Sequence, residues 1–113
     1  TIIEGLNNAS KTNQEEIFGP VVTLIPFDDE GEAIQIANES DYGLSATIWT
    51  EDKERATRVS NQVEAGVIWV NCWLVRDLRT PFGGMKQSGM GREGGAEALR
   101  FFTEQKNVCT STV

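Results

Sequence analysis

Histidine is absent from this chain of 113 residues, and cysteine occurs only twice. The lack of histidine excludes Ser–His and Cys–His nucleophile pairs and zinc sites built on histidine. Cys72 and Cys109 are too few for a disulfide scaffold and are not a closely spaced metal-binding pair. We therefore predict no metal site, and the cysteine usage suits a reducing compartment, the cytoplasm.

Positive charge is also scarce, because 10 Lys and Arg residues stand against 17 Asp and Glu and leave a net charge of −7. Binding to nucleic acid needs a basic face, so we expect no nucleic-acid partner. No apolar run approaches the ~20 residues that span a bilayer. The first residues lack the basic and apolar regions of a signal peptide, and we expect no membrane partner.

What the chain does contain is an alternation of strand and helix patterns. Residues 1–14 are mixed and polar and look like a connecting stretch, whereas the apolar run 20–27 is typical of a strand buried on both faces of a parallel sheet. Asp29 is a candidate helix cap with Glu32 as its reciprocal partner, and Thr50 is a candidate cap for a second helix that Gly66 would end.

Strands are predicted over 44–49 and 67–70, so the order is strand, helix, strand, helix, strand. This order predicts an α/β fold with parallel strands joined by right-handed crossovers. Residues 71–93 form a long glycine-rich loop, and a short helix follows with Ala96, Leu99 and Phe102 on one face. The end of the chain, 106–113, is rich in β-branched residues and is β-prone.

The most specific segment is the run from Pro81 to Glu93, with four glycines and two cations in 13 residues. Its spacing fits neither a phosphate-binding P-loop nor a dinucleotide-binding glycine turn. The residues alone therefore favour a flexible surface loop over a phosphate cradle.

This run resembles the late signature of the aldehyde dehydrogenase superfamily. Three more stretches, at 15–21, 42–46 and 65–71, resemble the same family in the same order, and the resemblance extends from residue 1 to 113. It implies a C-terminal part of the family's α/β catalytic domain in residues 1–103 and an oligomerisation β-arm in 104–113. The implied partners are the remainder of the dehydrogenase chain, a small-molecule aldehyde and further copies in a homodimer or homotetramer.

The resemblance also assigns site residues. Glu16 matches a glutamate that accepts hydrogen bonds from the nicotinamide ribose, Phe18 an aromatic beside the nicotinamide ring, and Phe82 an aromatic that lines the substrate tunnel. NAD is the expected cofactor, and NADP stays open because the residues that contact the adenosine ribose are upstream. From the residues alone, Glu16 is a solvated charge, Phe18 a core residue and Phe82 a loop anchor. Lys86, Arg92 and Glu93 are expected to hold the loop together.

In this family a cysteine thiolate attacks the aldehyde, a glutamate is the base, and an asparagine side chain helps to stabilise the oxyanion. The resemblance places all of these upstream, so we expect no catalytic residue in this chain and no activity from the chain alone. Cys72 follows the strand in a Val-Asn-Cys stretch where the family has no nucleophile. Cys109 falls in the arm, and both cysteines are expected to be structural.

Arg76 and Arg79 are the informative departures in the loop. The stretch 71–80 resembles the branch of the family that oxidises 2-hydroxymuconic and 2-aminomuconic semialdehydes, which carry a carboxylate remote from the aldehyde. Arginine matches a carboxylate bidentately, so we expect Arg76 to bind it. The alternatives are a surface pair of Asp77 with Arg76 or Arg79, which we favour for Arg79, a dehydrogenase for neutral aldehydes with Arg76 in solvent, and a non-catalytic assembly or binding fragment.

Overall fold

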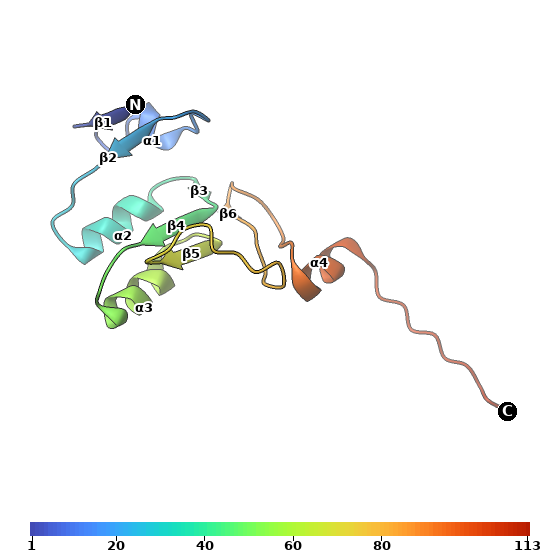
Figure 1. The fold of residues 1–113 in the computed structure, drawn as a ribbon. Coiled ribbons are helices and arrows are strands. Elements are labelled where there is room, and N and C mark those ends of the chain that lie inside the picture. Colours follow the sequence, from blue (N-terminus) through green and yellow to red (C-terminus); the bar gives the residue numbers. More distant parts are fainter.

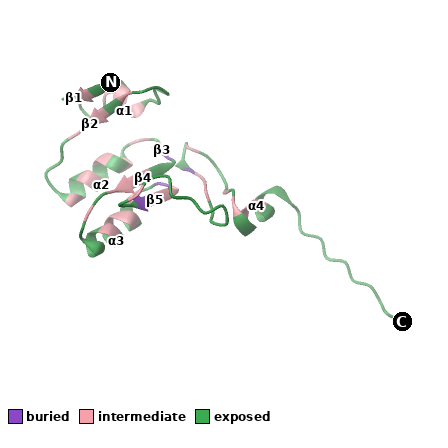
Figure 2. Ribbon diagram, in the orientation of Figure 1, coloured by how far each residue is buried: buried purple, intermediate pink, exposed green.

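The computed structural model describes residues 1–113 and has an α/β architecture built from three separate two-stranded sheets. The molecule measures 76 × 32 × 21 Å, and its long axis includes a tail that leaves the folded part after the last helix (Figure 1). Only four residues are buried, among them Ala65 and Trp69. Figure 2 shows that most of the surface of the elements is exposed or half-buried, so the chain encloses very little core by itself.

The N-terminal residues are structured, and their prediction as a connecting stretch is wrong. Strand β1 (Ile2–Glu4) pairs in parallel with β2 (Val22–Leu24), and the short helix α1 (Lys11–Gln14) lies between them in sequence. The β-branched Ile2 and Ile3 suit this pairing. The predicted strand over 20–27 is confined to Val22–Leu24 and is not buried on both faces, because Val22 is 52% exposed.

The central unit contains helix α2 (Glu30–Asn38), strand β4 (Ser45–Ile48), helix α3 (Lys53–Gln62) and strand β5 (Val67–Val70). Strands β4 and β5 are parallel, with Ser45 opposite Val67 and Ile48 opposite Val70, which confirms the predicted parallel pairing. Strand β2 does not join this sheet. The pair is extended past its last residues by Asn71, whose side chain exchanges hydrogen bonds of 2.9 and 2.7 Å with the backbone of Thr50.

The two helix starts differ in how well they were predicted. Asp29 caps α2 by accepting a hydrogen bond of 2.9 Å from Glu32 N, while the Glu32 carboxylate accepts from Asp28 N at 2.6 Å. Helix α3 is capped by Asp52 and not by Thr50, because the Thr50 hydroxyl is engaged in a tight turn with Asp52 N. The Asp52 carboxylate then accepts from the free N–H groups of the first turn, a favourable position for a negative charge.

The remaining elements complete the loop and the C-terminus. Strand β3 (Tyr42–Gly43) pairs antiparallel with β6 (Met85–Lys86), which lies inside the predicted glycine-rich loop. Helix α4 (Gly95–Phe102) confirms the predicted short helix. Residues 103–113 form no strand within this chain and are exposed (Figure 2). No helix combines the length and apolar character needed to cross a bilayer.

Candidate functional site

The glycine-rich segment is a closed loop whose two ends are paired. Phe82 and Glu93 exchange two backbone hydrogen bonds, each of 2.8 Å. Within the loop, Arg92 donates from Nη1 to the carbonyl oxygens of Gly84 and Gly91, both at 2.8 Å. The segment is a largely exposed surface loop, as the residues alone indicated, and the expected stabilising role of Arg92 is confirmed.

Glycines let this loop lie directly against the start of β5. A Cβ atom added at Gly66 would stand 1.6 Å from the carbonyl oxygen of Gly83, so the two backbones are in contact there. A Cβ atom at Gly43 would stand 2.3 Å from the carbonyl oxygen of Glu64. The Ser88 hydroxyl accepts a hydrogen bond of 2.9 Å from Gly43 N, which ties the loop to β3. Close backbone contact, more than chain flexibility, is what these glycines provide.

Arg76 and Phe82, the two predicted substrate-binding residues, are brought together. The guanidinium carbon of Arg76 lies 4.4 Å from the centre of the Phe82 ring, a cation–π geometry. The sheet positions this contact, because the buried Trp69 of β5 donates from Nε1 to the carbonyl oxygen of Val75 at 2.8 Å. Val75, next to Arg76, is thus held by strand β5, and Phe82 is held by its backbone pairing with Glu93.

The charge of Arg76 has a partner that the sequence did not indicate. Arg76 Nη2 lies 2.5 Å from Glu93 Oε1, and both side chains are partly exposed. Arg76 is therefore not an unpaired cation: its guanidinium already has a carboxylate partner within the chain. The Arg76–Asp77 pair is not formed either.

Arg79 instead makes the surface pair with Asp77, as we favoured. Its Nε and Nη2 atoms lie 2.9 and 2.6 Å from the two carboxylate oxygens of Asp77. These hydrogen bonds from Arg79 lower the pKa of the Asp77 carboxyl below its usual value and raise the pKa of Arg79. The side chain of Arg79 is 88% exposed, so the pair adds little stability.

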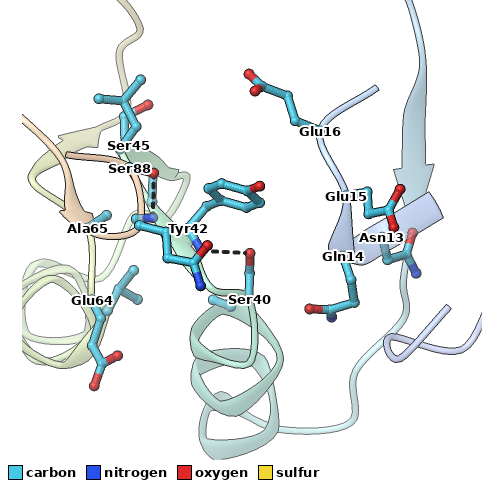
Figure 3. Close-up of a pocket in the computed structure, with 16 residues that line it drawn as sticks. Asn13, Gln14, Glu15, Glu16, Ser40, Tyr42, Ser45, Glu64, Ala65 and Ser88 are labelled. Atoms are coloured by element: carbon cyan, nitrogen blue, oxygen red, sulfur yellow. Dashed lines mark hydrogen bonds between the residues drawn. The ribbon is translucent and has the colours of Figure 1, made fainter. Parts of the chain in front are cut away.

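Glu16 and Phe18, the predicted cofactor residues, lie on the segment between α1 and β2. Glu16 lines an open cavity of about 560 Å³, across from Ser45 and Ser88 (Figure 3). A smaller hollow of about 260 Å³ is lined by both Glu16 and Phe18. Phe18 is 93% exposed and adopts a positive φ of 52°, which is unusual for an aromatic residue. Its interpretation as a core residue is therefore wrong for this chain.

The predicted cofactor residues, Glu16 and Phe18, and the predicted substrate residues, Arg76 and Phe82, do not form one site within this chain. The two cavities that Glu16 lines are not lined by Arg76 or Phe82, and Phe82 lines a separate hollow formed mainly by the glycine-rich loop. The Glu16 carboxylate makes no ion pair within the chain. A carboxylate and an aromatic ring that are both open on one segment fit the hydroxyl groups and the flat ring of a nucleoside.

Neither cysteine has the surroundings of an activated nucleophile. Cys72 is half-buried and Cys109 is exposed, and both are free thiols. The only hydrogen-bonding partner of Cys109 is the amide oxygen of Asn107 at 3.8 Å, which is no base. A nucleophilic thiol needs a neighbouring base or cation that stabilises the thiolate, and neither cysteine has one within hydrogen-bonding distance.

Glu93 is the residue of this site whose role the sequence analysis missed in part. It was expected to hold the loop, and it does so, but its pairing with Arg76 joins positions that are 17 residues apart. A pairing across a loop leaves no periodic signal in the sequence. The spacing of Arg76 and Glu93 therefore could not have identified it.

Comparisons with known proteins identify the family of this chain. Residues 1–108 match the aldehyde dehydrogenase family. The chain is 58% identical over 109 residues to the 2-hydroxymuconic semialdehyde dehydrogenase of Pseudomonas sp. (strain CF600), and 57% identical over 108 residues to the 2-aminomuconic semialdehyde dehydrogenase of Danio rerio. Each match covers 96% of this chain and 22% of the relative, so the chain spans about a fifth of the length of these relatives.

Solved structures have the same fold. HpcC from Thermus thermophilus matches with a TM-score of 0.88 and 45% identity, over 99% of this chain and 23% of that protein. The P. syringae indole-3-acetaldehyde dehydrogenase AldA, in complex with NAD+ and IAA, matches with a TM-score of 0.89 and 47% identity, over 93% of this chain and 21% of that protein. The paired glycine-rich loop, the β4–β5 unit and these similarities lead to the same conclusion. The chain belongs to the aldehyde dehydrogenase family.

Proposed function

We propose that this chain is the C-terminal part of an NAD-dependent dehydrogenase that oxidises 2-hydroxymuconic or 2-aminomuconic 6-semialdehyde to the carboxylic acid. The observation that carries this proposal is the placement of Arg76 on the face of Phe82, within the paired glycine-rich loop. The relatives with muconic semialdehyde names support the substrate class. The nucleophilic cysteine and the general-base glutamate belong to other parts of the enzyme, so the isolated chain should not turn over.

Glu16 and Phe18 are proposed to hold the nicotinamide end of NAD. The carboxylate of Glu16 accepts hydrogen bonds from paired hydroxyl groups, and the exposed ring of Phe18 packs beside a flat ring. NAD, when bound, supplies the acceptor for the hydride of the substrate. The complexes of related aldehyde dehydrogenases with NAD+ support this choice of cofactor.

Arg76 is proposed to select the acidic substrate. A guanidinium in contact with an aromatic ring is restricted in the direction of its N–H donors, and a carboxylate can be bound by two of them at once. A substrate with a remote carboxylate would be placed in this way along Phe82. Neutral aldehydes would lack the interaction and would be disfavoured by comparison.

The test is kcat/KM of the full-length enzyme on a muconic semialdehyde and on a short neutral aldehyde. Arg76→Ala should lower kcat/KM of the acidic substrate. The expected loss of transition-state stabilisation is about 2–4 kcal/mol, on the scale of losing a charge pair withdrawn from water. The neutral aldehyde should lose little. Arg76→Lys should recover part of the loss, because an ammonium group cannot form the bidentate fork.

Arg79→Ala is the matched control, because Arg79 is a cation in the same loop whose partner is the exposed Asp77. Its selectivity should equal that of the wild type. Equal losses of Arg76→Ala on both substrates would favour the enzyme for neutral aldehydes. Turnover by the purified 113-residue chain would contradict the view that the catalytic groups lie elsewhere.

The proposal also covers the oligomeric state of the enzyme and its cellular compartment. Residues 104–113 are β-prone and project from the folded part (Figure 1), and we propose that they are an oligomerisation arm in a homodimer or homotetramer. The two free thiols support a reducing compartment, the cytoplasm.

A further inference from the structure

Arg76 is held on two sides by residues that are themselves paired. The Phe82 ring lies with its centre 4.4 Å from the guanidinium carbon, and the Glu93 carboxylate accepts a hydrogen bond from one of the N–H groups. Because Phe82 and Glu93 exchange two backbone hydrogen bonds, these two contacts come from one hydrogen-bonded backbone pair. The direction of the guanidinium is therefore set by the closed end of the glycine-rich loop.

The remaining donors of Arg76 have no acceptor in the chain. Only its Nη2 atom takes part in a hydrogen bond, and that bond goes to Glu93 Oε1 at 2.5 Å. The side chain of Arg76 is 43% exposed, so another edge of the guanidinium stays open to a second carboxylate. Arginine can bind two carboxylates because its donors point along different edges of the plane.

We propose that Glu93 is the resident counter-ion of Arg76 and a specificity-determining positioning residue for an acidic aldehyde. The inference rests on the proposed function, since it assumes that a substrate carboxylate binds at Arg76. Glu93 acts in two opposite ways: it holds the guanidinium against Phe82, and its negative charge weakens the attraction of Arg76 for a second anion. The affinity for the acidic substrate is the balance of the two.

Two substitutions at Glu93 separate these effects in the full-length enzyme. Glu93→Gln keeps an oxygen acceptor of the same reach but removes the charge, so the acidic substrate should bind better, with KM lower by about three- to tenfold. Glu93→Asp keeps the charge but shortens the reach to Arg76, so kcat/KM of the acidic substrate should fall by about three- to tenfold. A short neutral aldehyde should be unaffected by either change.

Glu97→Gln is the matched control, because Glu97 is a glutamate in the first turn of α4 and makes an exposed ion pair of 2.8 Å with Arg100. It should leave both substrates unchanged. Thermal unfolding of every variant shows whether the loop is intact, and Glu93→Asp still tests the proposal if Glu93→Gln fails to fold.

Opposite shifts of Glu93→Gln and Glu93→Asp, confined to the acidic substrate, are the expected result. Equal losses on the acidic and neutral aldehydes in both variants would overturn the proposal and leave Glu93 a purely structural residue. The Arg76→Ala variant separates the two failures. If Arg76→Ala impairs the acidic substrate selectively while the Glu93 variants do not, only the counter-ion role is wrong. If Arg76→Ala is not selective, the proposed substrate class itself is wrong.

Discussion

Lys86 places its Nζ atom 2.6 Å from the carbonyl oxygen of Asn38, so a cation from the glycine-rich loop binds the C-terminal end of α2. The same Nζ atom lies 3.0 Å from the carbonyl oxygen of Ser40 and 2.9 Å from Glu64 Oε2. A positive charge is favourable at a helix C-terminus, where carbonyl groups lack partners within the helix. The expected role of Lys86 in holding the loop is confirmed.

Substitution of Lys86 by Met should destabilise the enzyme, because the apolar end of Met leaves these acceptors without a donor. We expect the free energy of unfolding to fall by about 1–3 kcal/mol. Chemical denaturation of the full-length protein measures it. Lys11→Met is the control, since its pair with Glu15 is 3.6 Å long and both side chains are largely exposed, and its loss should change stability little.

Gly66→Ala should be more disruptive than its single added methyl group suggests. The new Cβ would stand 1.6 Å from the carbonyl oxygen of Gly83, so the start of β5 and the loop that carries Phe82 must separate. Overpacking of this kind costs about 1–3 kcal/mol or more. The control is Gly19→Ala, whose Cβ meets nothing closer than 3.9 Å. A thermal midpoint of Gly66→Ala equal to that of Gly19→Ala would refute the close contact.

The ionisation of Glu30 should make the stability of the α2–α3 pair depend on pH. Hydrogen bonds from Arg58, and further charge interactions with Arg58 and Arg55, lower the pKa of Glu30 from its ordinary value of 4.5. A lowered pKa means that the contribution of Glu30 is present above pH 4.5 and is lost as the pH falls through the lowered value in the folded state. Urea titrations of the wild type and Glu30→Gln should therefore differ at neutral pH and converge in acid.

Glu51→Gln provides the reference for that experiment, because Glu51 is exposed and takes part in none of the ion pairs of the chain. Its urea midpoint should follow the wild type at all pH values. A constant difference between the wild type and Glu30→Gln from neutral to acid pH would contradict the role of the ion pairs with α3.

Glu16→Gln should weaken the binding of NAD in the full-length enzyme. The amide keeps the shape of the side chain but removes the charge that strengthens hydrogen bonds from ribose hydroxyls, a loss of about 1.5–3 kcal/mol. Isothermal titration with NAD measures the affinity, and single-turnover kinetics measure hydride transfer. Glu4→Gln is the control, because Glu4 lies on β1 and lines neither of the two cavities that Glu16 lines. Unchanged NAD affinity and an unchanged rate of hydride transfer in Glu16→Gln would contradict the role of Glu16 in binding the nicotinamide ribose.

Deletion of residues 107–113 should lower the oligomeric state or the solubility of the full-length enzyme. The segment is β-prone, forms no strand within the chain and leaves the folded part (Figure 1). An unpaired β-prone segment is expected to pair with another subunit. Light scattering of the truncated and intact enzymes at equal concentration decides the matter, and an unchanged mass would count against an assembly role.

Local sequence signals predicted the elements whose causes are local. The cap at Asp29 follows from a side chain that reaches an N–H group three residues on, and the strand Val67–Val70 from a run of β-formers after a glycine. The start of α3 was placed two residues early, because Thr50 and Asp52 are both good caps and their competition is decided by the turn that Thr50 makes. The strand Ile2–Glu4 was missed, because short strands depend on their partner.

The sequence by itself determined the family, the α/β order and the identity of the candidate side chains, since these rest on local pattern and on motif. Only the tertiary structure decided which of those side chains meet. The pairing of Arg76 with Glu93, its contact with Phe82 and the bond from Lys86 to the end of α2 all join distant segments. Such contacts depend on how β5 and the glycine-rich loop pack, and packing is set by the shape of the whole surface rather than by spacing along the chain.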